Sequence, residues 1–143
     1  MLKRKVYQEL LKWKAEANGK ALYIIGARQI GKTTLIREFG KNEYEHFAEI
    51  NFVTDEKAAD IFKDKLTAET IITNLTAYLQ TPLEPGKTLI LFDEVQECPA
   101  VRSAIKFLVE DGRFDYIESG SLLGVRYKEV RSYPVGFEQI LPM

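Results

Sequence analysis

Residues 21–35 read ALYIIGARQIGKTTL, an apolar run that leads into a glycine-bracketed loop and then into a helix-forming stretch. The run over residues 21–25 is short and continuously apolar, which is typical of a strand buried on both faces of a sheet. Residues 26–33 match the pattern G-x-x-x-x-G-K-[ST] in full. A strand, such a loop and a helix in this order predict a phosphate-binding loop.

The chemistry of this loop assigns a role to each fixed position. The two glycines let successive backbone N–H groups point at one phosphate, and the following helix directs its positive end to the same place. We expect Lys32 to reach the β and γ phosphates and the Thr33 hydroxyl to ligate Mg²⁺. By chance the four fixed positions occur in roughly one sequence of this length in 200. The candidate phosphate-binding residues are Gly26, Ala27, Arg28, Gln29, Ile30, Gly31, Lys32 and Thr33.

A second candidate element is the acidic pair Asp93-Glu94, which follows the apolar run over residues 88–92. A buried strand would deliver Asp93 to the sheet edge, where its carboxylate can hold Mg²⁺, usually through water. Glu94 can then orient and polarise a water for in-line attack on the terminal phosphate. An acidic strand end is by itself often a polar turn. Its place roughly 60 residues beyond a complete phosphate loop favours the catalytic interpretation.

The remaining pattern alternates strands with helices. We expect further strands over residues 47–53, 114–118 and within 132–143, and helices over 2–17, over 33–39 up to Gly40, and from Thr54, Thr67 and Pro99. This predicts an α/β fold of three layers, in which a parallel sheet of about five strands is flanked by helices. Ligands of such sheets bind beyond the carboxyl ends of the strands, where both candidate elements fall.

Ser119 and Ser121 flank Gly120 at the end of the expected fourth strand. A hydroxyl at this place can contact the γ phosphate or the attacking water. Serines in a glycine-containing turn are also common local hydrogen-bonding groups. Both interpretations stay open on the residues alone.

Composition limits the classes of protein that fit. A length of 143 residues predicts one domain, with a helix over residues 1–19 before a core over 20–143. The 20 Lys and Arg against 21 Asp and Glu give a net charge of −1, so no global basic field attracts nucleic acid or anionic lipid. A single Cys and a single His exclude an internal disulfide and a Cys/His zinc site. With no apolar segment of membrane-spanning length, we expect a cytoplasmic protein without membrane contact.

With these elements in order, the chain resembles the AAA+ superfamily of P-loop ATPases. The motifs that carry the resemblance are residues 26–34, FDEVQ at 92–96 and ESGS at 118–121. They look more closely like those of a prokaryotic ATP-binding family whose longer members continue into a C-terminal nuclease-like domain. This similarity implies that the chain, which stops at Met143 before a helical lid, is the N-terminal part of a longer protein.

The resemblance also implies roles for single residues. Thr34 joins the set that binds phosphates and Mg²⁺, and Asp93 becomes the Walker B aspartate. Glu94 becomes the catalytic glutamate, and Ser119 or Ser121 the sensor 1 residue. Gln96 follows the acidic pair and is a candidate contact for the nucleotide or the attacking water.

These observations predict an ATPase domain that uses ATP and Mg²⁺ and couples its nucleotide state to conformational change in attached domains or partners. Its effector, a protein or a nucleic acid, is unknown, and self-association is possible. One alternative is an ATP-gated switch or scaffold that hydrolyses slowly or not at all, and a second is a small-molecule phosphotransferase. A further hypothesis is DNA binding by the basic N-terminal helix through Lys3, Arg4 and Lys5.

Overall fold

A single parallel sheet forms the middle layer of the molecule. The computed structural model describes residues 2–16, 19–26, 31–121 and 135–143. Within them the strand order is β2-β3-β4-β1-β5, and every pairing is parallel. The expected fold class is thereby confirmed. The strands are β1 (Ala21–Gly26), β2 (His46–Asn51), β3 (Thr88–Asp93), β4 (Asp115–Ser121) and β5 (Glu138–Pro142).

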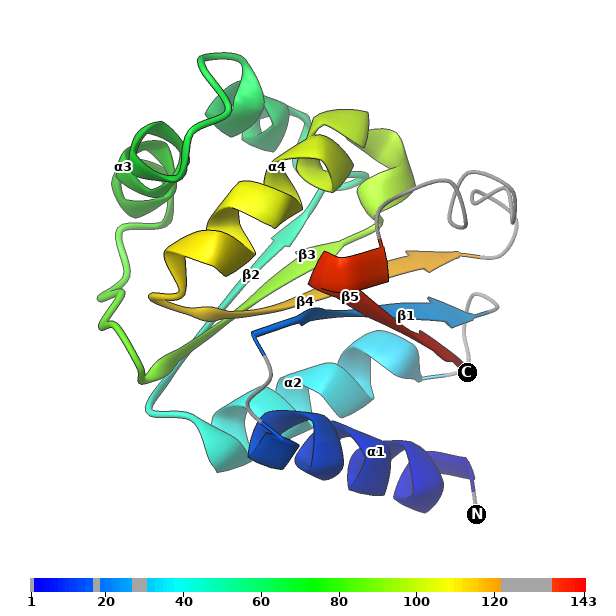
Figure 1. Ribbon diagram of the computed structural model, residues 1–143. Helices are drawn as coiled ribbons and strands as arrows, with labels where there is room; N and C mark the ends of the chain where they lie inside the picture. Colours follow the sequence, from blue (N-terminus) through cyan, green and yellow to red (C-terminus); the bar gives the residue numbers. More distant parts are fainter. Residues whose placement is uncertain (1, 17–18, 27–30, 122–134) are drawn as a thin grey trace.

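Helices cover both faces of the sheet (Figure 1). One face carries α1 (Leu2–Glu16) and α2 (Lys32–Glu43). The opposite face carries α3 (Ala68–Leu79), α4 (Pro99–Asp111) and the 3-10 helix η1 (Glu56–Phe62). Two short 3-10 turns complete the described elements: η2 (Val95–Glu97) and η3 (Val135–Phe137). No helix in the described part of the chain is long and apolar enough to cross a bilayer.

Local sequence explains where α3 and α4 begin and end. Thr67 caps α3, since its side chain accepts a hydrogen bond from the backbone N–H of Thr70 at 3.3 Å. Pro99 occupies the first turn of α4, where its missing N–H costs nothing. Gly112 ends α4 in the left-handed conformation, with φ of 76°. The predicted helix starts at Thr67 and Pro99 are confirmed.

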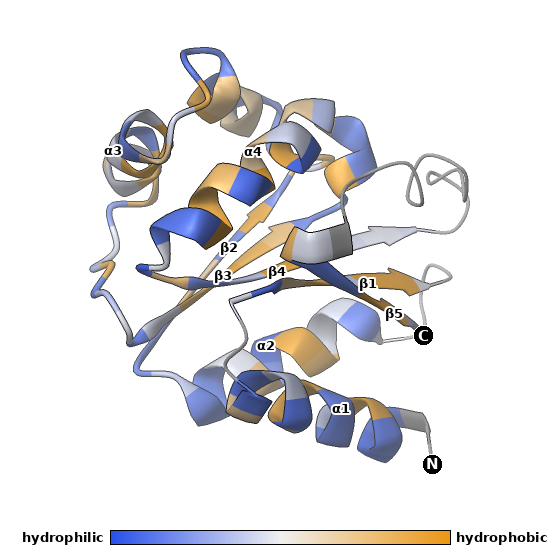
Figure 2. Ribbon diagram, in the orientation of Figure 1, coloured by the Kyte–Doolittle hydropathy of each residue, from blue (hydrophilic) through white to orange (hydrophobic). Residues whose placement is uncertain are grey.

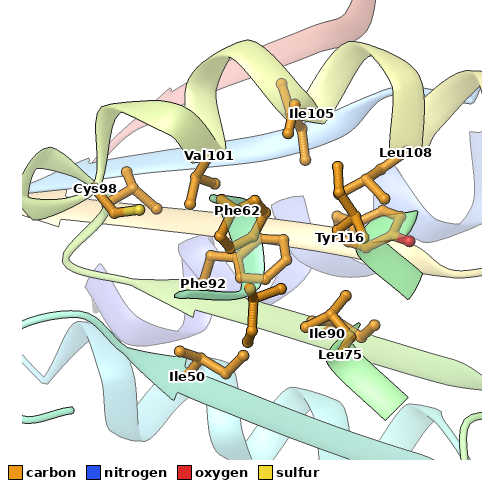
Figure 3. Packing of buried hydrophobic residues seen from close by; sticks show 14 of the residues in the cluster. Ile50, Phe62, Leu75, Ile90, Phe92, Cys98, Val101, Ile105, Leu108 and Tyr116 are labelled. Carbon is orange, nitrogen blue, oxygen red and sulfur yellow. The ribbon is translucent and has the colours of Figure 1, made fainter. Parts of the chain in front are cut away.

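The core on the α4 face is rich in aromatic rings. Phe92 of β3 stacks on Tyr116 of β4 with ring centroids 5.9 Å apart, and Phe62 of η1 meets Phe92 edge to face at 5.7 Å. Figure 3 shows these rings beneath the side chains that α4 directs at the sheet, among them Val101 and Leu108. Such packing fixes η1 and α4 against β3, the strand that ends at Asp93.

The core on the other face joins α1 and α2 to the sheet. Leu10 and Trp13 of α1 pack with Ile36 and Phe39 of α2, and all four side chains are buried. Figure 2 shows hydrophobic stretches in β1 and β3 and a largely hydrophilic outer surface on α1. The amphipathic pattern of the N-terminal helix therefore anchors α1 beside α2.

The expected end of α2 at Gly40 is wrong, because the helix continues to Glu43. Gly40 is a buried interior residue, and a Cβ atom built there would lie 2.2 Å from Cδ1 of Phe47. The glycine provides room for the Phe47 ring rather than a helix stop.

Two further expectations on element boundaries need correction. The fourth strand was expected to end at Glu118, but β4 runs to Ser121, so the two serines belong to the strand and not to a turn. The second strand ends at Asn51 rather than Val53. The segment that was expected to start a helix at Thr54 forms the 3-10 helix η1. β2 therefore ends earlier, and β4 later, than the sequence predicted.

A buried charged cluster lies between α4 and the sheet. Arg102 of α4 is hydrogen-bonded to Glu138 of β5 and lies 3.5 Å from the Glu118 carboxylate of β4. The guanidinium also stacks over the Tyr23 ring, 4.3 Å from its centroid. Burial, together with the neighbouring Glu138 carboxyl, raises the pKa of Glu118 well above its ordinary value.

Candidate functional site

The candidate residues gather at the carboxyl edge of the sheet because four parallel strands end there side by side. Asn51 at the end of β2 pairs in register with Asp93 at the end of β3. Gly26 at the end of β1 pairs with Ser121 at the end of β4. This is the edge at which ligands of parallel sheets bind.

The end of the phosphate-loop pattern is well defined. Gly31 adopts the left-handed conformation with φ of 79°, which favours glycine, and immediately precedes α2. Its carbonyl accepts the first helical hydrogen bond, from Leu35 N at 3.0 Å. Ala27, Arg28, Gln29 and Ile30 lie outside the described residues, so their expected role stays a prediction.

Lys32 is only 5 % exposed, although it carries a charge. Its ammonium donates a hydrogen bond to the Gly120 carbonyl of β4 at 2.9 Å. A buried ammonium needs such partners, because desolvation of an ion is costly. The contact holds Lys32 across the sheet edge, between α2 and the end of β4.

Asp93 lies at the centre of the site and is 2 % exposed. Its Oδ2 accepts hydrogen bonds from the Thr33 hydroxyl at 3.0 Å and from Nδ2 of Asn51 at 3.4 Å. Its Oδ1 accepts one from the Ser119 hydroxyl. Hydrogen-bond donors on α2, β2 and β4 thus fix the orientation of the Asp93 carboxylate at the end of β3.

Glu94 follows on a turn with an uncommon backbone conformation. Its φ is 58° and its ψ is 48°, the left-handed region that non-glycine residues seldom adopt. The side chain is half-buried, and its Oε2 accepts a hydrogen bond from Nε2 of Gln96 at 2.5 Å.

The structure brings four of the sequence-predicted residues together: Lys32, Thr33, Asp93 and Ser119. Ser119 is thus the sensor candidate that touches the acidic residue, while Ser121 is buried at the strand end opposite Gly26. Thr34 is exposed on α2. The assigned roles of these residues remain predictions.

Sequence reasoning missed two residues near the site. Asn51 reaches Asp93 from the neighbouring strand, and the only sequence signal was a polar residue near the end of an expected strand. Lys3 of α1 lies beside the phosphate loop: its Nζ is 3.7 Å from the position that a Cβ would take at Gly31. No local motif marks Lys3.

The donor set of the site suits Mg²⁺. The described residues hold no group of three His, Cys, Asp or Glu side chains that could bind a metal by themselves. The Thr33 hydroxyl and the Asp93 carboxylate, however, are oxygen ligands on adjoining elements and lie within hydrogen-bond distance of each other. Mg²⁺ is commonly held by one or two such protein ligands together with phosphate oxygens and water.

Comparison with known proteins gives the same picture of the fold. The sequence matches the AAA domain family over residues 18–143. The comparison with curated proteins gave no match.

Several solved structures are similar to the chain, among them the following three. PCH-2 of C. elegans has a TM-score of 0.59 at 13 % identity, covering 99 % of this chain and 42 % of that one. The RuvB Holliday junction branch migration motor of Thermotoga maritima has 0.57 at 16 %, with coverage of 97 % and 44 %. Drosophila ORC, bound to AT-rich DNA and Cdc6, has 0.54 at 11 %, with 99 % and 55 %. The chain thus spans about half the length of these proteins, and the likeness shows a common fold.

Proposed function

Since this chain belongs to the AAA domain family, we propose that it binds ATP together with Mg²⁺ and hydrolyses it. The observation that carries the proposal is the convergence of Lys32, Thr33 and Asp93 on one edge of the sheet, with Glu94 directly after Asp93. The spacing of these residues in the sequence and their contacts across three elements support the same chemistry. We also propose that the nucleotide state is coupled to attached regions or partners.

Each residue has a definite task in this proposal. Thr33 and Asp93 would hold Mg²⁺, which when bound neutralises phosphate charge. Lys32 would bind the phosphates with an ammonium that α2 and β4 already place at the edge. Glu94 would accept a proton from the attacking water, the role of a general base.

The first test compares wild-type protein with Glu94→Gln. We expect Glu94→Gln to lose turnover by about 100-fold or more, since a positioned general base contributes 10²–10⁴ in rate. Its affinity for MgATP should stay within about twofold of wild type, because the phosphate-binding residues are intact. Phosphate release measures turnover and isothermal titration measures binding. Glu97→Gln, an exposed position on the same turn, is the matched control.

The outcomes separate the alternatives. Equal turnover in wild type and Glu94→Gln would remove Glu94 from this role. If both proteins bind MgATP and neither turns it over, the chain is an ATP-gated switch. Absence of MgATP binding by folded wild-type protein would overturn the proposed function as a whole.

A further inference from the structure

The side chain of Gln96 is hydrogen-bonded to Glu94, the candidate general base. It lies on η2, two residues after Glu94, and its Nε2 donates to Oε2 of Glu94 at 2.5 Å. A hydrogen bond is strong only where donor and acceptor are well aligned, so the accepting oxygen is held near the direction of the amide N–H. This contact therefore restricts the directions in which the Glu94 carboxylate can point.

The backbone of the turn supports the same restriction. A non-glycine residue in the left-handed region is strained, so the surroundings must hold Glu94 in place. Val95 is fully buried, and Cys98 N donates to Val95 O at 3.0 Å. Glu97 N donates to Glu94 O at 3.1 Å. The turn thus presents Glu94 and Gln96 to each other on a fixed backbone.

Gln96 makes no other side-chain hydrogen bond within the described residues. Its Oε1 is buried and has no hydrogen-bond partner there. A glutamine that served only to hold the fold together would use both ends of its amide, because an unpaired buried oxygen is destabilising. The described contacts of this amide are directed at Glu94 alone.

We propose that Gln96 is a positioning residue for Glu94. Its amide N–H holds the carboxylate of the general base in the orientation from which it takes a proton from water. This inference rests on the proposed function and deepens it, because Gln96 acts on hydrolysis through Glu94 and not on nucleotide binding.

The kinetic test uses Gln96→Ala with Glu97→Ala as the matched control, an exposed residue of the same turn. We expect Gln96→Ala to lower kcat about ten- to a hundredfold, less than the loss in Glu94→Gln. KM and the Kd for MgATP should change by less than about twofold. Unchanged or increased kcat in a folded Gln96→Ala variant would overturn the proposal, and so would a weakened Kd at constant kcat.

A double-mutant cycle tests whether Gln96 acts through Glu94. In the Glu94→Gln background, Gln96→Ala should change the residual single-turnover rate by less than about twofold. An equal loss in both backgrounds would show that Gln96 acts independently and would overturn the proposal. If turnover is lost in Glu94→Gln but kept in Gln96→Ala, the inference about Gln96 is overturned and the proposed function is not. Absence of any turnover in wild type defeats both.

A readout without nucleotide addresses the hydrogen bond itself. In an NMR spectrum of the full chain, the side-chain amide of Gln96 is the glutamine signal that Gln96→Ala removes. We expect this signal to move in Glu94→Gln, because its hydrogen-bond acceptor changes, and to keep its wild-type position in Glu97→Gln. A Gln96 signal that behaves alike in the wild type and Glu94→Gln would contradict the contact.

Discussion

Asp93 accepts hydrogen bonds from residues of three elements, so the orientation of its carboxylate is set by the fold before any ligand binds. Preorganised groups need no rearrangement at the moment of reaction, which is a large part of what enzymes contribute. Ser119 matters here because its bond to Asp93 joins β4 to the same carboxylate. We therefore propose Ser119 as the sensor residue, since its hydroxyl contacts Asp93.

Lys3 provides a prediction at the scale of one residue. Its exposed ammonium lies beside Gly31, and it has no ion-pair partner in the described part of the chain. Lys3→Ala should weaken MgATP affinity about two- to fivefold at low salt, a size typical of exposed charge pairs. The effect should fade at high ionic strength, because exposed charges are screened.

Isothermal titration of MgATP at about 0.05 and about 0.5 M salt measures this effect. Lys12→Ala is the control, since Lys12 is exposed on the same helix. An equal loss of affinity in both variants would indicate a general charge effect of α1. No loss in Lys3→Ala would show that the ammonium does not reach the phosphates.

A site residue could be predicted from the sequence where local spacing fixes its position, and not where packing between distant elements fixes it. Lys32, Thr33 and Asp93 were found from the sequence, because the turn of a phosphate loop and the end of a buried strand fix their spacing locally. Asn51 was missed, since its contact depends on the register between β2 and β3. Lys3 was missed because its place depends on how α1 packs beside α2.

At the scale of elements, α2 packs closely against β2 at Gly40. A Cβ at position 40 would meet the Phe47 ring at 2.2 Å. Gly40→Ala should therefore lower the free energy of unfolding by about 1–2 kcal/mol, as overpacking costs about 1–3 kcal/mol and improved helix propensity returns up to about 1. Urea denaturation measures the change.

The partner substitution makes this prediction sharper. In a Phe47→Leu background the ring is gone, so Gly40→Ala should be harmless or stabilising. If Gly40→Ala instead stabilises the chain with Phe47 in place, α2 tolerates a methyl group and the steric argument fails.

The elements themselves were predicted better than their ends. Alternation of apolar runs with helical spacing gave all five strands and their helical neighbours. The interpretation of Gly40 was wrong because a glycine that ends a helix and one that makes room for a ring look the same in sequence. Likewise β4 extends to Ser121 because backbone pairing with β1 continues to Gly26, beyond the last apolar residue.

At the scale of the whole molecule, the cluster of Arg102, Glu118 and Glu138 joins α4, β4 and β5 in the interior. One guanidinium faces two carboxyl groups there, and Glu118 is fully buried. Neutralising one carboxyl relieves both desolvation and like-charge repulsion. The native state therefore favours protonated Glu118.

This cluster makes the stability of the fold depend on pH. Since burial and Glu138 raise the native pKa of Glu118 well above 4.5, the native state binds up to one more proton than the unfolded chain between pH 4.5 and that native pKa. Stability is fully present below about pH 4.5 and falls as pH rises, by up to about 1.4 kcal/mol per unit, until the native carboxyl ionises. Glu118→Gln should flatten this slope and raise stability at pH 7–8. Urea denaturation between pH 4 and 8 tests it against Glu110→Gln, an exposed control on α4; an unchanged slope in Glu118→Gln would place the protonation elsewhere.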